Sequence, residues 1–186
     1  MNPEPRTLNP TCMVSLSPNN LLVIFDLDET LVFTRMVRLY SIYNDPGDFQ
    51  IDLGDVVFDV FVRPGARKLI AYCQERFQVG VWSSAKEDYV QALAAQLFDL
   101  EKVAFIRHRD HCVMVVEDDT FGSGPVKDLR SLGHPLDQLV IVDDDPATAR
   151  CNLANLIRVT GFRDNPQGSD LFQVLEELKR RTNASQ

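Results

Sequence analysis

The sequence predicts an α/β fold with a mainly parallel central sheet. Short, continuous apolar runs alternate along the chain with segments of helical periodicity, and three of these runs end abruptly at carboxylates or hydroxyls. A continuous apolar run is typical of a strand buried on both faces, as in a parallel sheet. Strands that alternate with helices indicate α/β layers, in which ligands bind at the carboxyl ends of the strands.

The first half of the chain begins with such a run. LLVIF at 21–25 predicts a buried strand that ends in DLDET. Residues 36–42 and 56–62 are rich in β-branched and aromatic side chains, with turn residues between them. We therefore expect a β-ribbon inserted after the first strand. A proline-glycine pair then opens a helix over roughly 66–76.

The same two periodicities predict the rest of the chain. The expected elements are a buried strand at 78–82, a helix from there to about residue 98, short strands at 103–107 and 112–116, a loop at 120–125, buried strands at 139–142 and 156–159, and a last helix at 169–181.

Length and composition limit the function classes. The chain has 186 residues, of which 45% are hydrophobic and 25% charged, as in a soluble globular protein. Residues 1–20 hold four prolines and predict an extended arm before one domain over 21–182. A net charge of −8 argues against direct binding to nucleic acid or an anionic membrane. The sequence predicts neither a membrane-spanning segment nor a signal peptide, and the four cysteines lack metal-type spacing. We expect a nuclear or cytoplasmic monomer.

The polar residues after the apolar strands indicate the chemistry. Asp26 and Asp28 lie two residues apart, so in extended chain they project to the same side. One can act as nucleophile and the other as proton donor, provided that a cation relieves their repulsion. Asp143 and Asp144 add oxygen ligands of the kind that Mg²⁺ prefers beside a substrate phosphate.

Two further groups complete this pattern. Ser83, followed by Ser84, offers a hydroxyl and main-chain donors to anionic oxygens, and Lys127 can supply positive charge to a phosphoryl group. Each feature alone is common: an aspartate pair in a turn, a serine cap, a helix start or a surface lysine. Their occurrence together, in this order and at strand ends, favours a phosphoryl-transfer site.

Five segments carry a resemblance to a known family. They are DLDETLV at 26–32, RPG at 63–65, VWSSA at 81–85, VKDL at 126–129 and VDDDP at 142–146. In this order they resemble the haloacid dehalogenase (HAD) superfamily, and more closely its small phosphatases that act on the C-terminal domain of RNA polymerase II, the NLI-interacting-factor-like subfamily. The resemblance implies a three-layer, Rossmann-like HAD fold over about residues 21–181.

The resemblance also implies a role for each matching residue. Asp26 corresponds to the nucleophile that becomes an aspartyl phosphate, and Asp28 to the general acid that later activates water. Ser83 and Lys127 correspond to the groups that bind the phosphoryl oxygens. The implied phosphate-binding set is Thr30 (also a loop-shaping residue), Ser83, Ser84, Arg109 and Lys127. The implied Mg²⁺ ligands are Asp26, the main-chain carbonyl of Asp28, Asp143 and Asp144.

The chain departs from the family pattern in three places. WSSA replaces a segment that usually reads FTAS, which keeps a hydroxyl at Ser83. Asp145 stands where the family commonly has serine and adds a negative charge. The segment between Cys112 and Lys127 does not match the aromatic-bearing insert by which some members grip proline, so the resemblance says less about polymerase-tail specificity than about catalysis.

The spacing of the motifs predicts an open site. The β-ribbon and the first helix occupy most of the chain between Asp26 and Ser83, and a helix and short strands fill the gap to Lys127, so neither gap holds a large cap domain. An open site suits a phosphorylated protein segment. The sequence therefore predicts a Mg²⁺-dependent phosphoserine/phosphothreonine phosphatase. Two alternatives remain: a phosphatase of small phosphate esters, and a binding module without catalysis.

Overall fold

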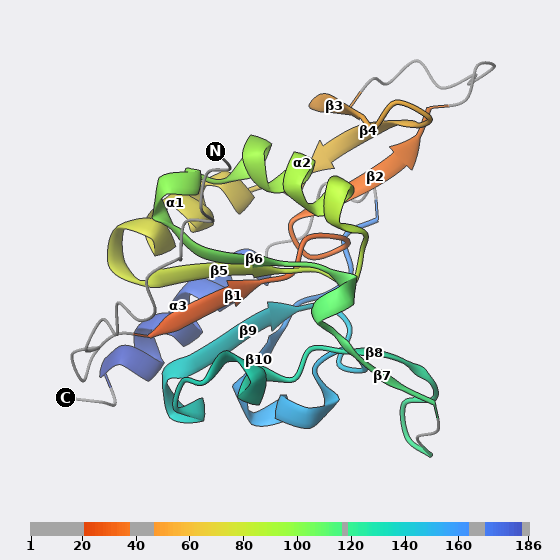
Figure 1. The fold of residues 1–186 in the computed structure, drawn as a ribbon. Coiled ribbons are helices and arrows are strands. Elements are labelled where there is room, and N and C mark those ends of the chain that lie inside the picture. The colour runs from red at the N-terminus through yellow and green to blue at the C-terminus, as the bar shows by residue number, and fades with distance from the viewer. Residues whose placement is uncertain (1–20, 38–46, 117–118, 164–169, 184–186) are drawn as a thin grey trace, which may run out of the picture.

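The computed structural model describes residues 21–37, 47–116, 119–163 and 170–183. Its centre is a five-stranded sheet in which every paired strand is parallel, with the order β10-β9-β1-β5-β6 (Figure 1). The strands are β1 (Leu22–Phe25), β5 (Gln78–Trp82), β6 (Val103–Arg107), β9 (Leu139–Asp143) and β10 (Leu156–Arg158). The buried strands predicted from the apolar runs are thereby confirmed. The expected arm at 1–20 lies outside the described residues.

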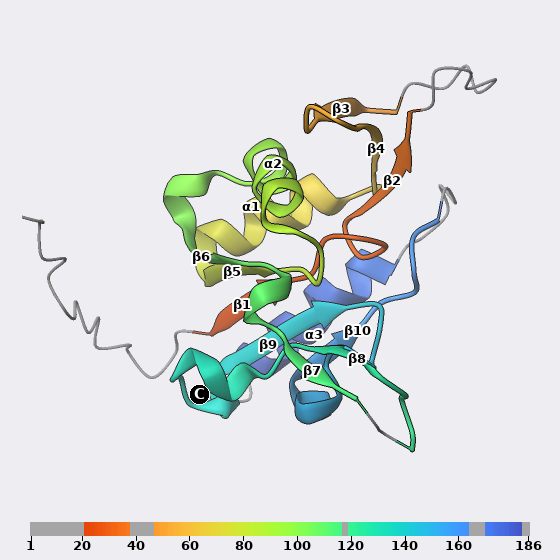
Figure 2. The same ribbon diagram turned by 45° about the vertical axis from the view of Figure 1, so that its right-hand side comes forward.

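Three helices pack on one face of this sheet: α1 (Ala66–Arg76), α2 (Glu87–Leu97) and α3 (Asp170–Asn183). Val23 and Phe25 of β1 point to this side and share one core with all three helices. Figure 2 shows α1 and α2 side by side above the sheet. The helices predicted at 66–76 and up to residue 98 are confirmed, and α3 covers the described part of the last predicted helix. No helix of the described ranges is long and apolar enough to cross a membrane.

The opposite face is covered by short 3-10 segments and loops. Leu22 and Ile24, the alternate residues of β1, pack there against Leu129 and Ala149. Within the described residues, the 3-10 segments are Leu100–Lys102, Arg109–His111, Leu129–Leu132, Leu136–Gln138 and Arg150–Asn155. The sheet is therefore the middle of three layers, as expected.

The insertion after β1 is a three-stranded antiparallel sheet with the order β2-β4-β3. Its strands are β2 (Val32–Met36), β3 (Phe49–Asp52) and β4 (Val57–Val62). The strand expected at 56–62 is confirmed. The strand expected at 36–42 begins earlier, because the turn after β1 closes at Val32, whose N–H bonds the Leu27 carbonyl at 3.0 Å. Residues 38–42 of that expectation lie outside the described residues, and β3 was not predicted.

A hairpin of β7 (Val113–Val115) and β8 (Gly124–Val126) leads to Lys127. The sequence predicts a loop at 120–125, but Gly124 and Pro125 belong to β8. Glycine and proline are typical of turns, so the sequence did not indicate this short two-stranded ribbon. A proline is tolerated in such a ribbon because it lies at an edge, where its nitrogen needs no hydrogen-bond partner. Figure 1 shows this hairpin and the β2–β4 sheet projecting from the side towards which the central strands run.

Candidate active site

The polar ends of three central strands lie together at the carboxyl edge of the sheet, as the sequence predicts. Asp26 follows β1, Ser83 follows β5, and Asp143 ends β9. They line one open cavity of about 440 Å³. Its other lining residues are Asp28, Glu29, Ser84, Lys127, Asp144, Asp145, Pro146, Thr148, Arg158 and Arg163. Residues far apart in the sequence thus form a single site.

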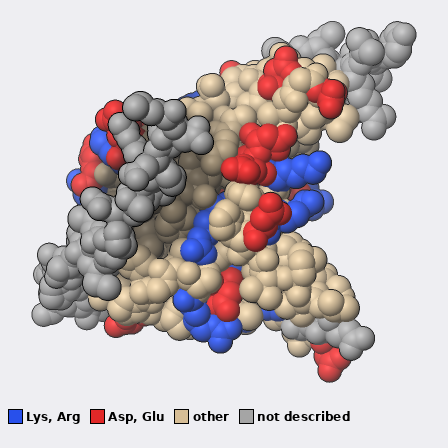
Figure 3. Space-filling view, viewed as in Figure 1, with Lys and Arg blue, Asp and Glu red and all other residues tan. Residues whose placement is uncertain are grey.

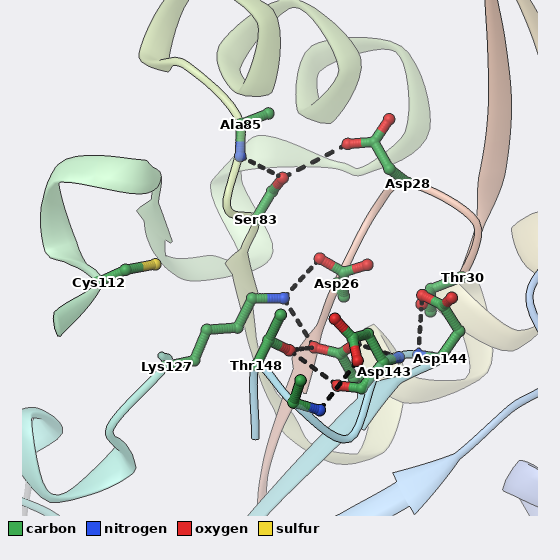
Figure 4. Close-up of polar contacts among 12 residues, drawn as sticks. Asp26, Asp28, Thr30, Ser83, Ala85, Cys112, Lys127, Asp143, Asp144 and Thr148 are labelled. Atoms are coloured by element: carbon green, nitrogen blue, oxygen red, sulfur yellow. Dashed lines mark hydrogen bonds and ion pairs between the residues drawn. The ribbon is translucent and has the colours of Figure 1, made fainter. Parts of the chain in front are cut away.

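Lys127 is the central cation of this site. Its Nζ donates to Asp26 Oδ1 at 2.6 Å and to Asp143 Oδ2 at 2.7 Å (Figure 4). Only 1% of Lys127 is exposed, so it is not a surface lysine. Its main chain is also held, because its N–H bonds the Thr148 carbonyl at 2.7 Å and its carbonyl accepts from Asn152 at 3.0 Å. The lysine therefore links the ends of β1 and β9 from a rigid position.

The turn after β1 separates the two aspartates of the DLDET motif. Glu29 has a φ of 58°, in the left-handed region that residues with a side chain rarely adopt. Hydrogen bonds hold it there: its N–H bonds Val32 O at 2.7 Å, and its carbonyl accepts from Phe162 at 2.6 Å. In Figure 4 the carboxyl group of Asp28 points towards Ser83, away from Asp143 and Asp144. The strained turn thus directs the two carboxyl groups to different partners, that of Asp26 to Lys127 and that of Asp28 towards Ser83.

The DDDP turn after β9 is fixed by hydrogen bonds to its carboxylates. Asp143 Oδ2 accepts from Thr148 Oγ1 at 2.8 Å, and its Oδ1 accepts from the Asp145 N–H at 2.9 Å. Asp145 Oδ1 in turn accepts from the Ala147 N–H at 2.9 Å. The aspartate that replaces the family's usual serine therefore shapes this turn, a role that short polar side chains share.

Thr30 lies behind the cavity. It is fully buried, its hydroxyl donates to Asp144 Oδ1 at 3.2 Å, and it accepts from the Asp144 N–H at 3.1 Å. It does not line the cavity. The structure thus supports the loop-shaping role of Thr30, in which it orients Asp144, and not direct contact with a phosphate.

Three carboxylates fit a divalent cation. Asp26, Asp143 and Asp144 each offer an oxygen atom, and these atoms lie within 4.8 Å of one another. Hard oxygen donors of this kind suit Mg²⁺. The Asp28 carboxyl group lies apart from this set, so Asp28 can contribute only the main-chain carbonyl that the resemblance implies. The donor chemistry agrees with the expected metal site.

The charge balance of the site also favours a cation. Burial raises the pKa of Asp26 well above its ordinary value, against the opposing effect of Lys127. Burial also raises the pKa of Asp28, and burial with the charge of Asp143 raises that of Asp144 to about 6. For Lys127, burial favours a lower pKa, but the charges of Asp143 and Asp26 outweigh it and raise the pKa. Negative charge is in excess, and a divalent cation would relieve it.

We expect Asp144→Asn to stabilise the metal-free protein at pH 7. The pKa of Asp144 is raised to about 6 in the folded state, whereas an unfolded aspartate titrates near 4. The folded protein therefore binds more protons, and stability falls as the pH rises from about 4 to about 6, with the full cost present at pH 7. Because Asp144 is partly exposed, we expect a gain of about 1 kcal/mol in the free energy of unfolding.

Thermal melts with EDTA and with Mg²⁺ check this expectation. Mg²⁺ should raise the melting temperature of the wild type and have less effect on Asp144→Asn, because the cation binds the folded state through this carboxylate. The exposed aspartate Asp137 provides a matched control, Asp137→Asn, which should leave both melts unchanged. An Asp144→Asn protein that is less stable in EDTA, with an unchanged Mg²⁺ response, would contradict the assignment.

Ser83 and Ser84, which the sequence predicts to bind anionic oxygens, both line the cavity. The Ser83 oxygen accepts from the Ala85 N–H at 3.0 Å, which orients its hydroxyl, and 1% of the residue is exposed. Arg109 Nε donates to the Ser84 carbonyl at 2.8 Å. However, Arg109 lines a neighbouring cavity and not the one that contains Asp26. The structure thus places Arg109 at the border of the site.

The neighbouring cavity has a volume of about 530 Å³ and a mostly apolar wall. It is lined by Asp28, Thr34, Leu53, Asp55, Val56, Phe58, Ala85, Lys86, Asp88, Tyr89 and Arg109. Asp28 belongs to both cavities. The β2–β4 sheet and the start of α2 therefore form a second compartment directly beside the carboxyl group of Asp28. Figure 3 shows mixed acidic and basic clusters on the viewed face between that sheet and the β7–β8 hairpin.

Several polar residues of these cavities were not among the predicted site residues. Thr148, Arg158 and Arg163 line the main cavity, and Tyr89 lines the second. Tyr89 has the spacing of an apolar core residue on its helix, but a buried tyrosine hydroxyl needs a polar partner, and this requirement points to a contact near the site. Arg158 ends β10, and its Nε donates to the Asp144 carbonyl at 3.3 Å. Arg163 lies close to the site because the chain after β10 returns past Glu29, which its Nε contacts at 2.7 Å.

Comparison with known proteins places the chain in a family. The family model described as NLI interacting factor-like phosphatase matches residues 21–186. The chain belongs to this family. The match covers all the strands of the central sheet and all the residues that line the main cavity. The prediction from the five sequence segments is thereby confirmed.

Individual relatives agree with this assignment. CTD small phosphatase-like protein 1 of Caenorhabditis elegans is 29% identical over 165 residues, which cover 87% of this chain and 31% of the relative. The human Carboxy-terminal domain RNA polymerase II polypeptide A small phosphatase 1 is 27% identical over 170 residues, with coverages of 87% and 60%. This member of the NLI interacting factor-like family thus spans about a third of the worm protein.

A solved structure confirms the fold class. The structure of Fcp1, an essential RNA polymerase II CTD phosphatase, matches with a TM-score of 0.58 and 20% identity, and the match covers 90% of this chain and 49% of the other. This level of identity supports the common α/β fold. The HAD-like architecture expected from the sequence is therefore confirmed.

Proposed function

We propose that this chain is a Mg²⁺-dependent phosphatase that hydrolyses phosphoserine or phosphothreonine in a protein segment. The observation that carries this proposal is the buried cluster in which Lys127 holds Asp26 and Asp143, with Asp28 across the same cavity. This arrangement supplies a nucleophile, a fixed positive charge and a separate proton donor. The family membership of the chain supports the same chemistry.

The proposed reaction has two steps. The Asp26 carboxylate attacks phosphorus, the bond from phosphorus to the serine or threonine oxygen breaks, and Asp28 gives its proton to that oxygen. Water then attacks the phosphorus of the aspartyl phosphate while Asp28 takes a proton from it, and the bond to Asp26 breaks. The raised pKa of Asp28, caused chiefly by burial, suits a group that must first carry a proton.

Lys127, Ser83 and a metal ion handle the negative charge. The Lys127 ammonium stays protonated between two carboxylates and holds Asp26 in place. The Ser83 hydroxyl and nearby main-chain donors bind phosphoryl oxygens. Asp26, Asp144 and the main-chain carbonyl of Asp28 would hold Mg²⁺, with Asp143 close by, and the ion would offset the charge of the carboxylates and the phosphate.

The second cavity supports a peptide over a small ester. It adjoins Asp28, the proposed proton donor, and its lining includes the apolar rings of Phe58 and Tyr89 and the side chain of Arg109. A sugar phosphate would leave most of this surface exposed to water, whereas a peptide chain would cover it. The names of the relatives make the RNA polymerase II C-terminal domain the first peptide to test. The monomeric state and a nuclear or cytoplasmic location remain predictions.

We expect kcat/KM for phosphoserine or phosphothreonine peptides to exceed that for sugar and nucleotide phosphates by at least about tenfold, because only the peptides fill the second cavity. A panel assay with Mg²⁺, and in parallel with EDTA, measures both substrate class and metal dependence. Equal or better hydrolysis of the small esters would favour the alternative substrate class. No hydrolysis of any substrate by folded, Mg²⁺-loaded protein would favour a binding module.

A further inference from the structure

Tyr89 makes a direct hydrogen bond to the proposed general acid. It is the third residue of α2, 9% of it is exposed, and its hydroxyl donates to Asp28 Oδ1. The same hydroxyl lies 2.8 Å from Thr34 Oγ1 on β2. A phenol has a single proton, which here goes to Asp28, so Thr34 must be the donor in the second bond. A chain of two hydrogen bonds thus runs from β2 through Tyr89 to Asp28.

Packing holds the Tyr89 ring in this position. The Phe58 ring of β4 meets it edge-on, with centroids 5.4 Å apart and an interplanar angle of 75°. Such edge-to-face pairs are a favourable arrangement of buried aromatic rings. Helix α2 and the β2–β4 sheet therefore fix the hydroxyl together. The other side-chain contact of Asp28 is weaker, because the Ser83 hydroxyl lies 3.5 Å from Oδ2, at the limit of a hydrogen bond.

We propose that Tyr89 is a positioning residue that orients Asp28 for proton transfer to the leaving group. Because Oδ1 accepts the phenol proton, the proton that Asp28 delivers is carried by Oδ2. This atom faces Ser83, which lines the phosphate cavity. Without the Tyr89 hydroxyl, the carboxyl group can rotate and present its proton elsewhere. The inference rests on the proposed function, and it adds the residue that orients the general acid Asp28.

The Tyr89 hydroxyl also explains why the β2–β4 sheet matters to the chemistry. Thr34 and Phe58 belong to this sheet, and both contact Tyr89. The sheet thus acts on the general acid through one side chain, and not only as a wall of the second cavity. Loss of the Thr34 hydroxyl should weaken the same bond, because the phenol oxygen would lose its own donor.

Leaving-group dependence tests the proposal. A serine alkoxide is a poor leaving group and needs the proton of Asp28, whereas p-nitrophenolate leaves without it. We expect Tyr89→Phe to lower kcat/KM for a phosphoserine peptide by about 10- to 100-fold, a part of the full effect of general acid catalysis. For p-nitrophenyl phosphate the decrease should stay below about threefold. This parameter covers only the steps up to release of the leaving group, so hydrolysis of the aspartyl phosphate does not obscure it.

The ratio of the two kcat/KM values is independent of how much of a preparation is folded, because both are measured on the same protein. An equal decrease on both substrates, or no decrease on either, would overturn the proposal. Thr34→Val should change the ratio in the same direction by a smaller factor. Tyr72→Phe removes a phenol hydroxyl on α1, outside both cavities, and should leave the ratio unchanged; a change there equal to that of Tyr89→Phe would also overturn the proposal.

Asp28→Asn separates this inference from the function on which it rests. In this variant, kcat/KM for the phosphoserine peptide should decrease more than in Tyr89→Phe. The decrease for p-nitrophenyl phosphate should again be much smaller than the decrease for the peptide. If Asp28→Asn affects the peptide more than p-nitrophenyl phosphate and Tyr89→Phe does not, only the positioning role of Tyr89 fails. If Asp28→Asn loses both substrates equally, the general-acid assignment itself fails.

Discussion

Asp26→Asn should abolish turnover, with a decrease in kcat of at least about 10⁴-fold. The amide has nearly the shape of the carboxylate but lacks the anion that attacks phosphorus. The fold should persist, because Lys127 keeps its bond to Asp143 at 2.7 Å and the substitution removes one of several crowded negative charges. A decrease of this size would identify the group on which the reaction depends.

Hydrolysis of p-nitrophenyl phosphate and trapping of the phosphorylated protein measure this effect. The wild type should acquire a phosphoryl group that hydroxylamine removes, as expected for an acyl phosphate, and Asp26→Asn should acquire none. Asp137→Asn changes the same chemical groups at an exposed position of the fold and should keep turnover within about twofold of the wild type. Substantial residual turnover in Asp26→Asn would contradict the assignment of the nucleophile.

Lys127→Met should cost both activity and about 3–5 kcal/mol in the free energy of unfolding. Lys127 and Asp143 are each 1% exposed and Asp26 is 6% exposed, so the substitution leaves two buried carboxylates without their cation. Removal of one partner from a buried ionic cluster is costly because the remaining charges are then stabilised neither by a counterion nor by water. The pKa of Asp26, already raised by burial, should rise further without Lys127.

Urea denaturation in EDTA at neutral and mildly acidic pH measures this loss. Carboxyls with a raised pKa in the folded state destabilise it when ionised, and this cost diminishes as the pH falls and they bind protons. The difference between Lys127→Met and the wild type should therefore shrink at lower pH. Lys102→Met, at a lysine whose side chain is 54% exposed and paired with Asp99 at 3.4 Å, provides the control.

The two lysine substitutions should differ clearly. Lys102→Met should cost less than about 0.5 kcal/mol, because exposed ion pairs contribute little to stability. If Lys127→Met also cost so little, the side chain would not be the counterion of the buried carboxylates. Loss of activity without loss of stability would then require another explanation for its contacts with Asp26 and Asp143.

The central sheet and its functional edge could be predicted from the amino-acid order alone. A strand buried on both faces is apolar along nearly its whole length, so the runs LLVIF, QVGVW and LVIV can be recognised as strands. The change to a polar residue, Asp26, Ser83 or Asp143, shows where each strand leaves the core. Parallel strands carry these ends to the same side. The acidic pair, the hydroxyl and the carboxylates expected to hold a metal ion could therefore be predicted from the sequence.

The roles of Lys127 and Tyr89 depend on the tertiary structure. Lys127 reaches Asp26 across 101 positions of sequence, because β8 and the turn after β9 hold its main chain beside β1. Tyr89 has the spacing of an ordinary core residue on α2. Its hydroxyl meets Asp28 of the turn after β1 and Thr34 of β2 only because these segments pack against α2 in the folded protein. Local periodicity shows whether a residue is buried, but the partner of a buried polar group is chosen by chain segments that fold together from distant positions.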